Sequence, residues 1–278
     1  MCPCAGCCVE DGWAAAAPFV ADSDLPTTSG WITIPAPPGH GEAVPLRCWW
    51  ARPEHVPAPA GAVLVLPEVF GVNGWVRSVA DRLAAEGFSA LALPLFSRTA
   101  PGLELGYSDL ELQEGRSHKE RTTASQLLMD VGLAGEWLAR RQTQHDQGPA
   151  VGLGCVGFCF GGHVALLAAT LPAVTATCGF YGAGVVRGRP GGGPPTLDGV
   201  GEINGRLLVI CGRDDALIPE SDRHVIAAAL DSANRQRPQD QAHRLITLDG
   251  GHGFMCASRA DHRPSSACLL YTSDAADE

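Results

Sequence analysis

The sequence has little basic charge, no long apolar run and no basic segment at its start, and each absence excludes a class of protein. Lys119 is the one lysine among 20 basic residues, and the net charge is −10. Scattered basic residues in an acidic chain argue against a nucleic-acid surface. No apolar run approaches the ~20 residues of a membrane-spanning helix. The start, "MCPCAGCCVEDGW", lacks the features of a signal peptide. We expect a cytoplasmic, monomeric protein that binds neither membrane nor nucleic acid.

The cysteines favour a reducing compartment and predict no metal centre. Eleven cysteines occur without a secretory signal, which favours free thiols. Cys4 and Cys7 form a C-x-x-C pair, but no second pair follows as in a zinc ribbon, and no strand precedes it as in a redox site. The glycine spacing of a phosphate-binding loop is also missing. We therefore expect no metal and no cofactor.

Apolar runs alternate with helical patterns over residues 29–267, which predicts one α/β domain. A mainly parallel sheet with helices on both faces follows from this alternation. Residues 1–28 lack periodicity and predict a weakly ordered segment, and residues 187–205 predict a flexible insert. Strands are expected at 31–36, 44–51, 62–66, 88–94, 151–158, 173–181, 207–211 and 244–248, and helices at 73–86, 119–141, 161–171 and 220–234.

A cysteine lies between two glycines where a predicted strand meets a predicted helix. The spacing Gly157-x-Cys159-x-Gly161 is that of a nucleophile elbow, with cysteine in the usual place of serine. Such a turn would expose the sulfur at a helix N-terminus, where the helix dipole favours a thiolate. The alternative is a buried structural cysteine, a role that suits Cys155 inside the strand better.

Candidates for a base and an acid follow the next strand ends, where ligands of parallel sheets bind. His252 follows the last strand in "LDGGHGFM", and the chain order nucleophile, acid, histidine is that of α/β-hydrolases. In "VICGRDDALIPE" either Asp214 or Asp215 can orient the imidazole. Counting back from Ile218 favours Asp215.

From about residue 31 to 267 the chain resembles the dienelactone hydrolase family, which are α/β-hydrolases with a Cys-His-Asp triad. The matching stretches are "PEVFGVNGW", "ALPLFSRTAPG", "VGFCFGG", "FYGAG", "GRDDALIP" and "GGHGFM". The resemblance implies that Glu68 faces the nucleophile and helps to activate it. It also implies that the backbone N–H groups of Val69 and Phe160 form the oxyanion hole.

The implied reaction is hydrolysis of a small lactone or ester through a thioester on Cys159. Family members that open dienelactone hold its carboxylate with two arginines, and Arg98 matches the first. Cys256 stands in place of the second, and Arg259 follows three residues later. The alternatives are a broad carboxylesterase or thioesterase on the same fold, and a non-catalytic binding module.

The end of the sequence departs from the family pattern. The family continues into a final helix that covers the sheet, whereas this chain reads "CLLYTSDAADE". That string resembles a translated sequencing-library adaptor. We therefore expect residues 268–278 to be a non-native tail and the final helix to be missing.

Overall fold

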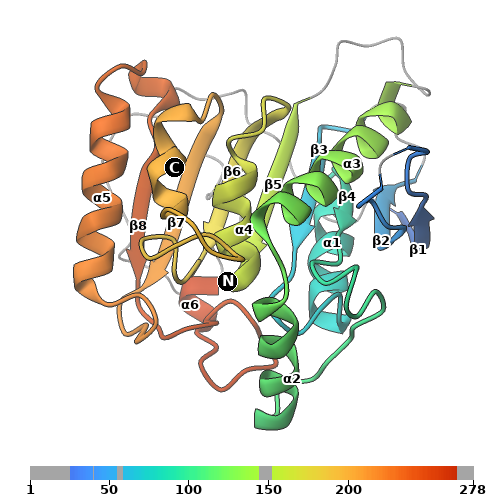
Figure 1. Ribbon diagram of the computed structural model, residues 1–278, viewed down its shortest axis with the longest axis horizontal. Coiled ribbons are helices and arrows are strands. Elements are labelled where there is room, and N and C mark those ends of the chain that lie inside the picture. Colours follow the sequence, from blue (N-terminus) through green and yellow to red (C-terminus); the bar gives the residue numbers. More distant parts are fainter. Residues whose placement is uncertain (1–25, 40, 55–58, 144–151, 268–278) are drawn as a thin grey trace.

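The computed structural model describes residues 26–39, 41–54, 59–143 and 152–267, which form an eight-stranded sheet covered by helices (Figure 1). The sheet starts with the antiparallel pair β1 (Thr27–Ile34) and β2 (Leu46–Pro53). This pair confirms the predicted hairpin, although β1 begins four residues earlier than expected.

Six further strands run parallel to one another, as the alternating pattern predicted. The spatial order is β1-β2-β4-β3-β5-β6-β7-β8. The order reverses beside β3, because the chain leaves it first for β4 and later returns to β5 on its other side. Ligands bind at such a reversal, at the carboxyl ends of the strands. The six strands are β3 (Ala62–Leu66), β4 (Ser89–Ala92), β5 (Leu153–Phe158), β6 (Val174–Phe180), β7 (Arg206–Gly212) and β8 (Arg244–Leu248).

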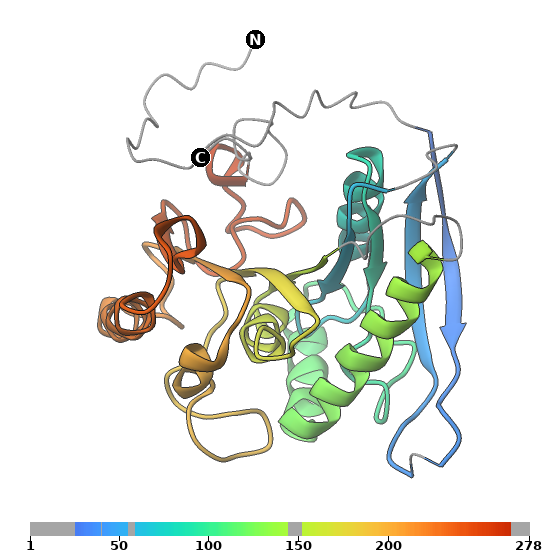
Figure 2. The same ribbon diagram turned by 90° about the horizontal axis from the view of Figure 1, so that it is seen from above.

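Helices lie on both faces of the sheet (Figure 2). The helix α1 (Gly74–Ala85) covers one face over the first four strands of the spatial order. A second layer covers the opposite face, where neighbouring helices contact one another in turn. Its members are α3 (Ala124–Thr143), α4 (Phe160–Ala168), the 3-10 helix η1 (Thr196–Glu202) and α5 (Glu220–Asn234). Two short elements complete the described chain: η2 (Gln239–Gln241) and α6 (Pro264–Ala267).

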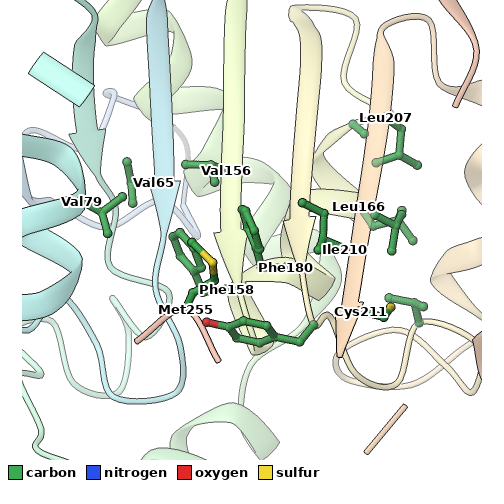
Figure 3. Close-up of a cluster of buried hydrophobic side chains, with 14 of the residues drawn as sticks. Val65, Val79, Val156, Phe158, Leu166, Phe180, Leu207, Ile210, Cys211 and Met255 are labelled. Atoms are coloured by element: carbon green, nitrogen blue, oxygen red, sulfur yellow. The ribbon is translucent and has the colours of Figure 1, made fainter. Parts of the chain in front are cut away.

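One core cluster consists of aliphatic and aromatic side chains that line the central strands (Figure 3), and it includes residues of α1 on one face of the sheet and of α4, η1 and α5 on the other. Phe158 and Phe180 stack with their ring centroids 5.2 Å apart, and Trp75 from α1 meets Phe158 edge to face. Phe158 immediately precedes Cys159 within the predicted elbow, so this packing fixes the strand end that carries the cysteine. Close packing of this kind makes the backbone at the site rigid.

The predicted helix 119–141 was wrong at its start, because two helices occupy this part of the chain. The helix α2 (Asp109–Glu120) precedes α3, and residues 121–123 separate them. A capping box begins α2: Ser108 accepts from the N–H of Glu111, whose carboxylate accepts from the N–H of Ser108. Most of the α2 surface is polar, so it lacks the apolar period that identifies a helix in a sequence. It lies at the carboxyl ends of the strands (Figure 1).

The predicted flexible insert 187–205 was also wrong in part. Its second half forms η1, which buries Leu197 and Val200 against the hydrophobic core. The glycines and prolines that indicated flexibility lie mostly before η1. Burial of these two side chains, rather than local propensity, explains the ordered turn.

Both predicted terminal segments lie essentially outside the described residues, so the weakly ordered segment 1–28 and the non-native tail 268–278 stay predictions; β1 already includes residues 27 and 28.

The sheet face opposite α5 is only partly covered at its far edge. Four apolar side chains there are half-buried: Cys178, Leu208, Ile246 and Leu248. Among the described helices, none combines the length and apolar character that crossing a membrane requires.

Candidate active site

Cys159 lies on a strained turn between β5 and α4. Its backbone has φ 53° and ψ −115°, a left-handed conformation that costs a non-glycine residue ~1–3 kcal/mol. The flanking glycines permit the turn. An ideal Cβ on Gly157 would lie 2.0 Å from the carbonyl oxygen of Gly161, and one on Gly161 would lie 2.2 Å from that of Leu66. The strand, the turn and the helix can therefore approach only without side chains at these positions.

The structure brings the predicted base and acid to Cys159. The Sγ of Cys159 lies 3.0 Å from Nε2 of His252, and Nδ1 of His252 lies 2.9 Å from Oδ2 of Asp215. The other oxygen of Asp215 accepts from the N–H of Leu217 at 2.8 Å. Asp215 is buried and Asp214 is exposed, so Asp215 is the carboxylate that contacts the imidazole.

The surroundings of His252 favour its charged form. Burial by itself disfavours an imidazolium, but the charge of Cys159 and the hydrogen bond to Asp215 outweigh this effect. Together they raise the pKa of His252 to about 10. A buried carboxylate that accepts from Nδ1 also fixes the ring tautomer and leaves Nε2 directed at the sulfur. Nε2 of His252 and the sulfur of Cys159 therefore form a hydrogen-bonded pair.

Glu68 follows β3 and is fully enclosed beside this pair. Its Oε1 accepts from the guanidinium of Arg259 at 2.9 Å, whereas its Oε2 is buried without a hydrogen-bond partner. Burial raises the pKa of Glu68, and the positive charges of Arg259 and His252 oppose that rise. A carboxylate with one bound and one free oxygen is prepared to accept a proton.

The two predicted oxyanion-hole groups belong to the residues that directly follow Glu68 and Cys159. Phe160 is the first residue of α4, where backbone N–H groups have no partner within the helix. Val69 follows Glu68, and its carbonyl oxygen meets α2 at Gly115. Within the described chain, neither the N–H of Val69 nor that of Phe160 has a recorded acceptor. Both donors therefore remain available to an oxyanion.

The sequence analysis did not give Arg259 and Tyr107 a place in the site. The thiol of Cys256 donates to the hydroxyl of Tyr107 at 3.1 Å, and the same oxygen accepts from the amide of Asn73, also at 3.1 Å. Arg259 reaches Glu68 from the loop after β8. The distance of Arg259 from His252 in the sequence did not reveal this contact, because it depends on how the loop folds back.

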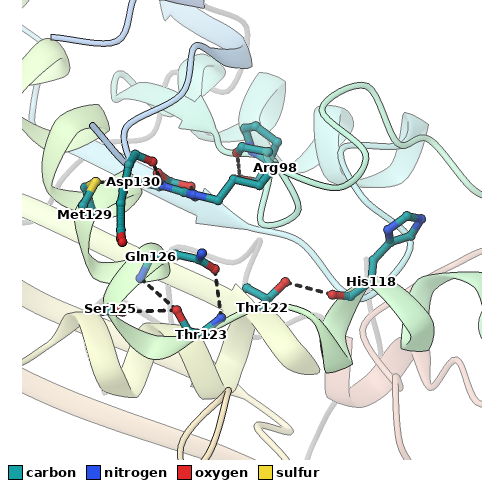
Figure 4. A network of polar contacts seen from close by, with 11 residues as sticks. Arg98, His118, Thr122, Thr123, Ser125, Gln126, Met129 and Asp130 are labelled. Carbon is teal, nitrogen blue, oxygen red and sulfur yellow. Dashed lines mark hydrogen bonds and ion pairs between the residues drawn. The ribbon is translucent and has the colours of Figure 1, made fainter. Parts of the chain in front are cut away.

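The recorded partners of Arg98 lie outside the triad, and Figure 4 shows Arg98 beside Asp130 and Met129. Its guanidinium donates to both carboxylate oxygens of Asp130, at 2.7 and 3.0 Å, and to the carbonyl oxygen of Glu42 at 2.9 Å. Asp130 is buried on α3, so the pair ties the loop after β4 to that helix. The substrate role of Arg98 stays a prediction, and these contacts also give the side chain a structural role.

Acidic, histidine and cysteine side chains are the usual protein ligands of a bound metal ion. In the part of the chain that the structure describes, no group of three or more of them could hold such an ion. Cys4 and Cys7 lie outside the described residues. The six described cysteines are all free thiols.

Comparison with known proteins identifies the family. The sequence model described as the dienelactone hydrolase family matches residues 46–276. A Synechocystis sp. protein provisionally named carboxymethylenebutenolidase is 36% identical over 206 residues, which cover 74% of this chain and 80% of that protein. The carboxymethylenebutenolidase of Pseudomonas putida is 29% identical over 212 residues, covering 76% and 82%.

Solved structures give the same result for the fold. A crystal structure from Klebsiella pneumoniae, provisionally named a dienelactone hydrolase, superposes with a TM-score of 0.74 at 25% identity, covering 88% of this chain and 95% of the other. An acylaminoacyl peptidase from Pyrococcus horikoshii shares the fold at 15% identity, with a TM-score of 0.60 over 88% of this chain and 40% of its own. The predicted α/β-hydrolase fold is thereby confirmed, and so is the assignment as a hydrolase of esters or lactones. The chain belongs to the dienelactone hydrolase family.

Proposed function

We propose that this protein hydrolyses a small lactone or ester with Cys159 as nucleophile and His252 as general base. Asp215 orients the imidazole and stabilises its charge. The observation that supports this most directly is the pair of contacts at 3.0 and 2.9 Å that joins these three side chains. The strained backbone of Cys159 is a second support, because strain of this kind concentrates at functional positions.

Acylation begins when the thiolate of Cys159 attacks the substrate carbonyl carbon. A carbon–sulfur bond forms, and the carbonyl electron pair moves to oxygen, where the N–H groups of Val69 and Phe160 stabilise it. Collapse of the tetrahedral intermediate breaks the carbon–oxygen bond to the alcohol. The imidazolium of His252 gives its proton to the leaving oxygen. A lactone thus opens into a thioester that retains both of its halves.

Deacylation reverses the direction of proton transfer. The Nε2 of His252 takes a proton from water, and the water oxygen attacks the thioester carbonyl. The same two N–H groups stabilise the second oxyanion. The carbon–sulfur bond then breaks, the acid leaves, and the proton on His252 returns to the sulfur of Cys159. No metal and no cofactor enters this sequence of steps.

We further propose that Glu68 and Arg259 adapt the site to substrates that carry a carboxylate. Arg259 is held by Glu68, and its side chain is 18% exposed, so a second carboxylate can reach it. A planar guanidinium binds carboxylates in a fixed fork, which a thiol such as Cys256 cannot replace. When the substrate takes over Arg259, Glu68 is released beside Cys159, accepts the thiol proton and passes it to Nε2 of His252, which later gives it to the leaving oxygen. This would confine ionisation of the sulfur to the substrate-bound protein.

Replacing the nucleophile tests the reaction type. Cys159→Ala should abolish hydrolysis of p-nitrophenyl acetate, and iodoacetamide should label Cys159 selectively in the native protein. Cys178→Ala is the matched control, because this half-buried thiol belongs to β6 and should leave the activity unchanged. Full activity in Cys159→Ala would eliminate the triad mechanism, and uniformly inert thiols would favour a binding module.

Replacing the arginine tests the substrate class. Arg259→Gln should lower kcat/KM for dienelactone, which carries a carboxylate, at least about 10-fold more than for p-nitrophenyl acetate. An equal loss on both substrates would instead favour the second candidate, a broad carboxylesterase or thioesterase. The missing arginine at Cys256 is the observation that keeps this second candidate open.

We also propose a cellular location and an oligomeric state for the protein. Six free thiols among the described residues and a net charge of −10 support a cytoplasmic protein that binds neither nucleic acid nor membrane. We propose that it acts on its small-molecule substrate as a monomer. Sedimentation equilibrium tests this, since a concentration-dependent mass would contradict it.

A further inference from the structure

The hydroxyl of Tyr107 joins two loops that carry groups of the proposed active site. It accepts a hydrogen bond from the amide of Asn73 and another from the thiol of Cys256, each at 3.1 Å. Asn73 belongs to the loop after β3, which also carries Glu68, and Cys256 belongs to the loop after β8. Tyr107 itself lies in a third loop, between β4 and α2. One phenol oxygen therefore connects the loop of Glu68 to the loop of Arg259.

The buried side chain of Asn73 gives this oxygen a fixed support. Its Oδ1 accepts from the N–H of Val76 at 3.2 Å and caps α1, and its Nδ2 also donates to the carbonyl oxygen of Leu105 at 3.0 Å. The N–H of Asn73 donates to the carbonyl oxygen of Gly71 at 2.9 Å, and the N–H of Gly71 donates to that of Glu68 at 3.4 Å. The position of Asn73 is thus tied to that of Glu68.

On the other side of Tyr107, Cys256 carries Arg259 through a short turn. The N–H of Arg259 donates to the carbonyl oxygen of Cys256 at 3.0 Å, and the N–H of Cys256 donates to that of Gly253, also at 3.0 Å. Burial raises the pKa of Cys256 to about 11, so at neutral pH the thiol keeps the proton that it donates to Tyr107. The place of the Arg259 backbone therefore follows from that of Cys256.

The guanidinium of Arg259 closes a ring of contacts. It donates to Oε1 of Glu68 at 2.9 Å, and its Cζ lies 5.9 Å from the ring centroid of Phe70. An ideal Cβ on Gly253 would lie 2.6 Å from the same Cζ, so the cation packs directly on the glycine backbone. Phe70 also meets the ring of Tyr107 edge to face, with centroids 4.7 Å apart. Contacts therefore run unbroken from Glu68 through Tyr107 to Arg259 and back.

Arg259 needs a second support once a substrate binds. In the proposed function, the carboxylate of the substrate replaces Glu68 as the partner of the guanidinium. The hydrogen bond between Cys256 and Tyr107 does not involve the guanidinium, so it persists and keeps the backbone of Arg259 in place. A cation that is fixed before binding loses less conformational freedom when it binds, and its affinity for the ligand is higher.

We propose that Tyr107 is a positioning residue for substrate specificity, whose hydroxyl acts through Cys256 to hold Arg259 where a substrate carboxylate binds. The inference rests on the proposed function, in which Arg259 selects substrates that carry a carboxylate. Tyr107 touches no reacting atom in this role, and no bond to it forms or breaks. A role in stability alone would affect substrates with and without a carboxylate alike, whereas a role in placing Arg259 affects mainly the former.

Tyr107→Phe tests the proposal, because it removes the hydroxyl and keeps the ring against Phe70. The readout is the ratio of kcat/KM for dienelactone to kcat/KM for p-nitrophenyl acetate, which has no carboxylate. We expect this ratio to fall roughly 5-fold, which corresponds to the net contribution of one hydrogen bond. An unchanged ratio would overturn the proposal.

Cys256 offers the same test from the other end of the hydrogen bond. Cys256→Ala should lower the ratio by a similar factor, and adding Tyr107→Phe should lower it no further, since the same bond is already lost. Cys256→Ser keeps a donor at this position and should restore the ratio. Additive losses in the double variant, or equal ratios in Cys256→Ala and Cys256→Ser, would contradict the assignment. The two Cys256 variants also decide the question if Tyr107→Phe does not fold.

Tyr181→Phe is the matched control for removal of a buried hydroxyl. This hydroxyl has no hydrogen-bond partner in the part of the chain that the structure describes, so its loss should leave the ratio unchanged. A fall as large as that in Tyr107→Phe would mean that the ratio reports general damage to the site, and the proposal would then fail.

Comparison with Arg259→Gln separates this inference from the proposed function. If Arg259→Gln lowers the ratio while Tyr107→Phe does not, only the role of Tyr107 is wrong. If Arg259→Gln leaves the ratio unchanged, the proposed class of carboxylate-bearing substrates is wrong, and the role of Tyr107 fails with it.

Discussion

Adding one methyl group to α2 should impair catalysis far more than folding. Gly115 packs against the residue that provides one predicted oxyanion-hole N–H. An ideal Cβ at Gly115 would lie 2.3 Å from the carbonyl oxygen of Val69 and 3.2 Å from its Cβ. Ordinary contacts begin near ~3.5 Å, so Gly115→Ala must push α2 and the Val69 loop apart by about 1 Å.

The expected magnitudes follow from this displacement. Overpacking of this kind costs ~1–3 kcal/mol, but alanine in place of glycine inside a helix returns about 1 kcal/mol. The net loss of stability should therefore be about 0–2 kcal/mol. A displacement of about 1 Å at a catalytic group costs roughly 100-fold in rate. We expect kcat/KM to fall by about that factor while the protein stays folded.

The assay is kcat/KM on p-nitrophenyl acetate, measured alongside urea unfolding. Gly132→Ala on α3 is the matched control, because a Cβ there meets nothing within 4 Å. It should gain up to about 1 kcal/mol of stability and keep its activity. If Gly115→Ala were as active as the wild type, the inferred link between α2 and the oxyanion hole would be wrong.

Three further predictions concern the triad, the loop arginine and a buried histidine. Asp215→Asn should lower kcat at least about 100-fold in ester hydrolysis, because the imidazole loses its orienting charge; a smaller loss would contradict the triad. Arg98→Ala should cost about 3 kcal/mol in urea unfolding by leaving Asp130 unpaired, with KM unchanged; a raised KM at unchanged stability would restore its substrate role. Burial lowers the pKa of His163 to about 4, so the unfolded chain binds the proton first and about 3 kcal/mol of stability is lost as the pH falls from 6.5 to 4. His163→Gln should flatten that part of the pH profile in urea unfolding, and an unchanged profile would refute this attribution.

Much of the sheet could be predicted because its strands are short apolar runs with clear boundaries. β3, α5 and β8 have the bounds that the sequence predicted. Helix α2 could not be predicted in the same way. Its residues are mostly polar, and Gly115, one of its two buried residues, provides no apolar side chain. Packing over the strand ends determines its position, and no local pattern reveals that.

The residues of the site also differ in whether the sequence alone could reveal them. Cys159, Asp215 and His252 were identifiable because each follows a strand, and the carboxyl ends of parallel strands meet at one edge. Arg259 and Tyr107 were not identifiable. Arg259 reaches Glu68 only through the path of a loop, and Tyr107 meets Cys256 from a part of the chain 149 residues away.

The segment between β8 and α6 bears both His252 and Arg259, with Cys256 between them. His252, the proposed general base, and Arg259, the cation that we expect to select the substrate, therefore lie on the same loop. This loop has about fifteen residues and contains no long helix or strand. We expect that replacing this loop with the loop of a relative changes which substrates bind, while Cys159 and Asp215 keep their positions after β5 and β7. Diversification within such a scaffold needs changes in only one loop.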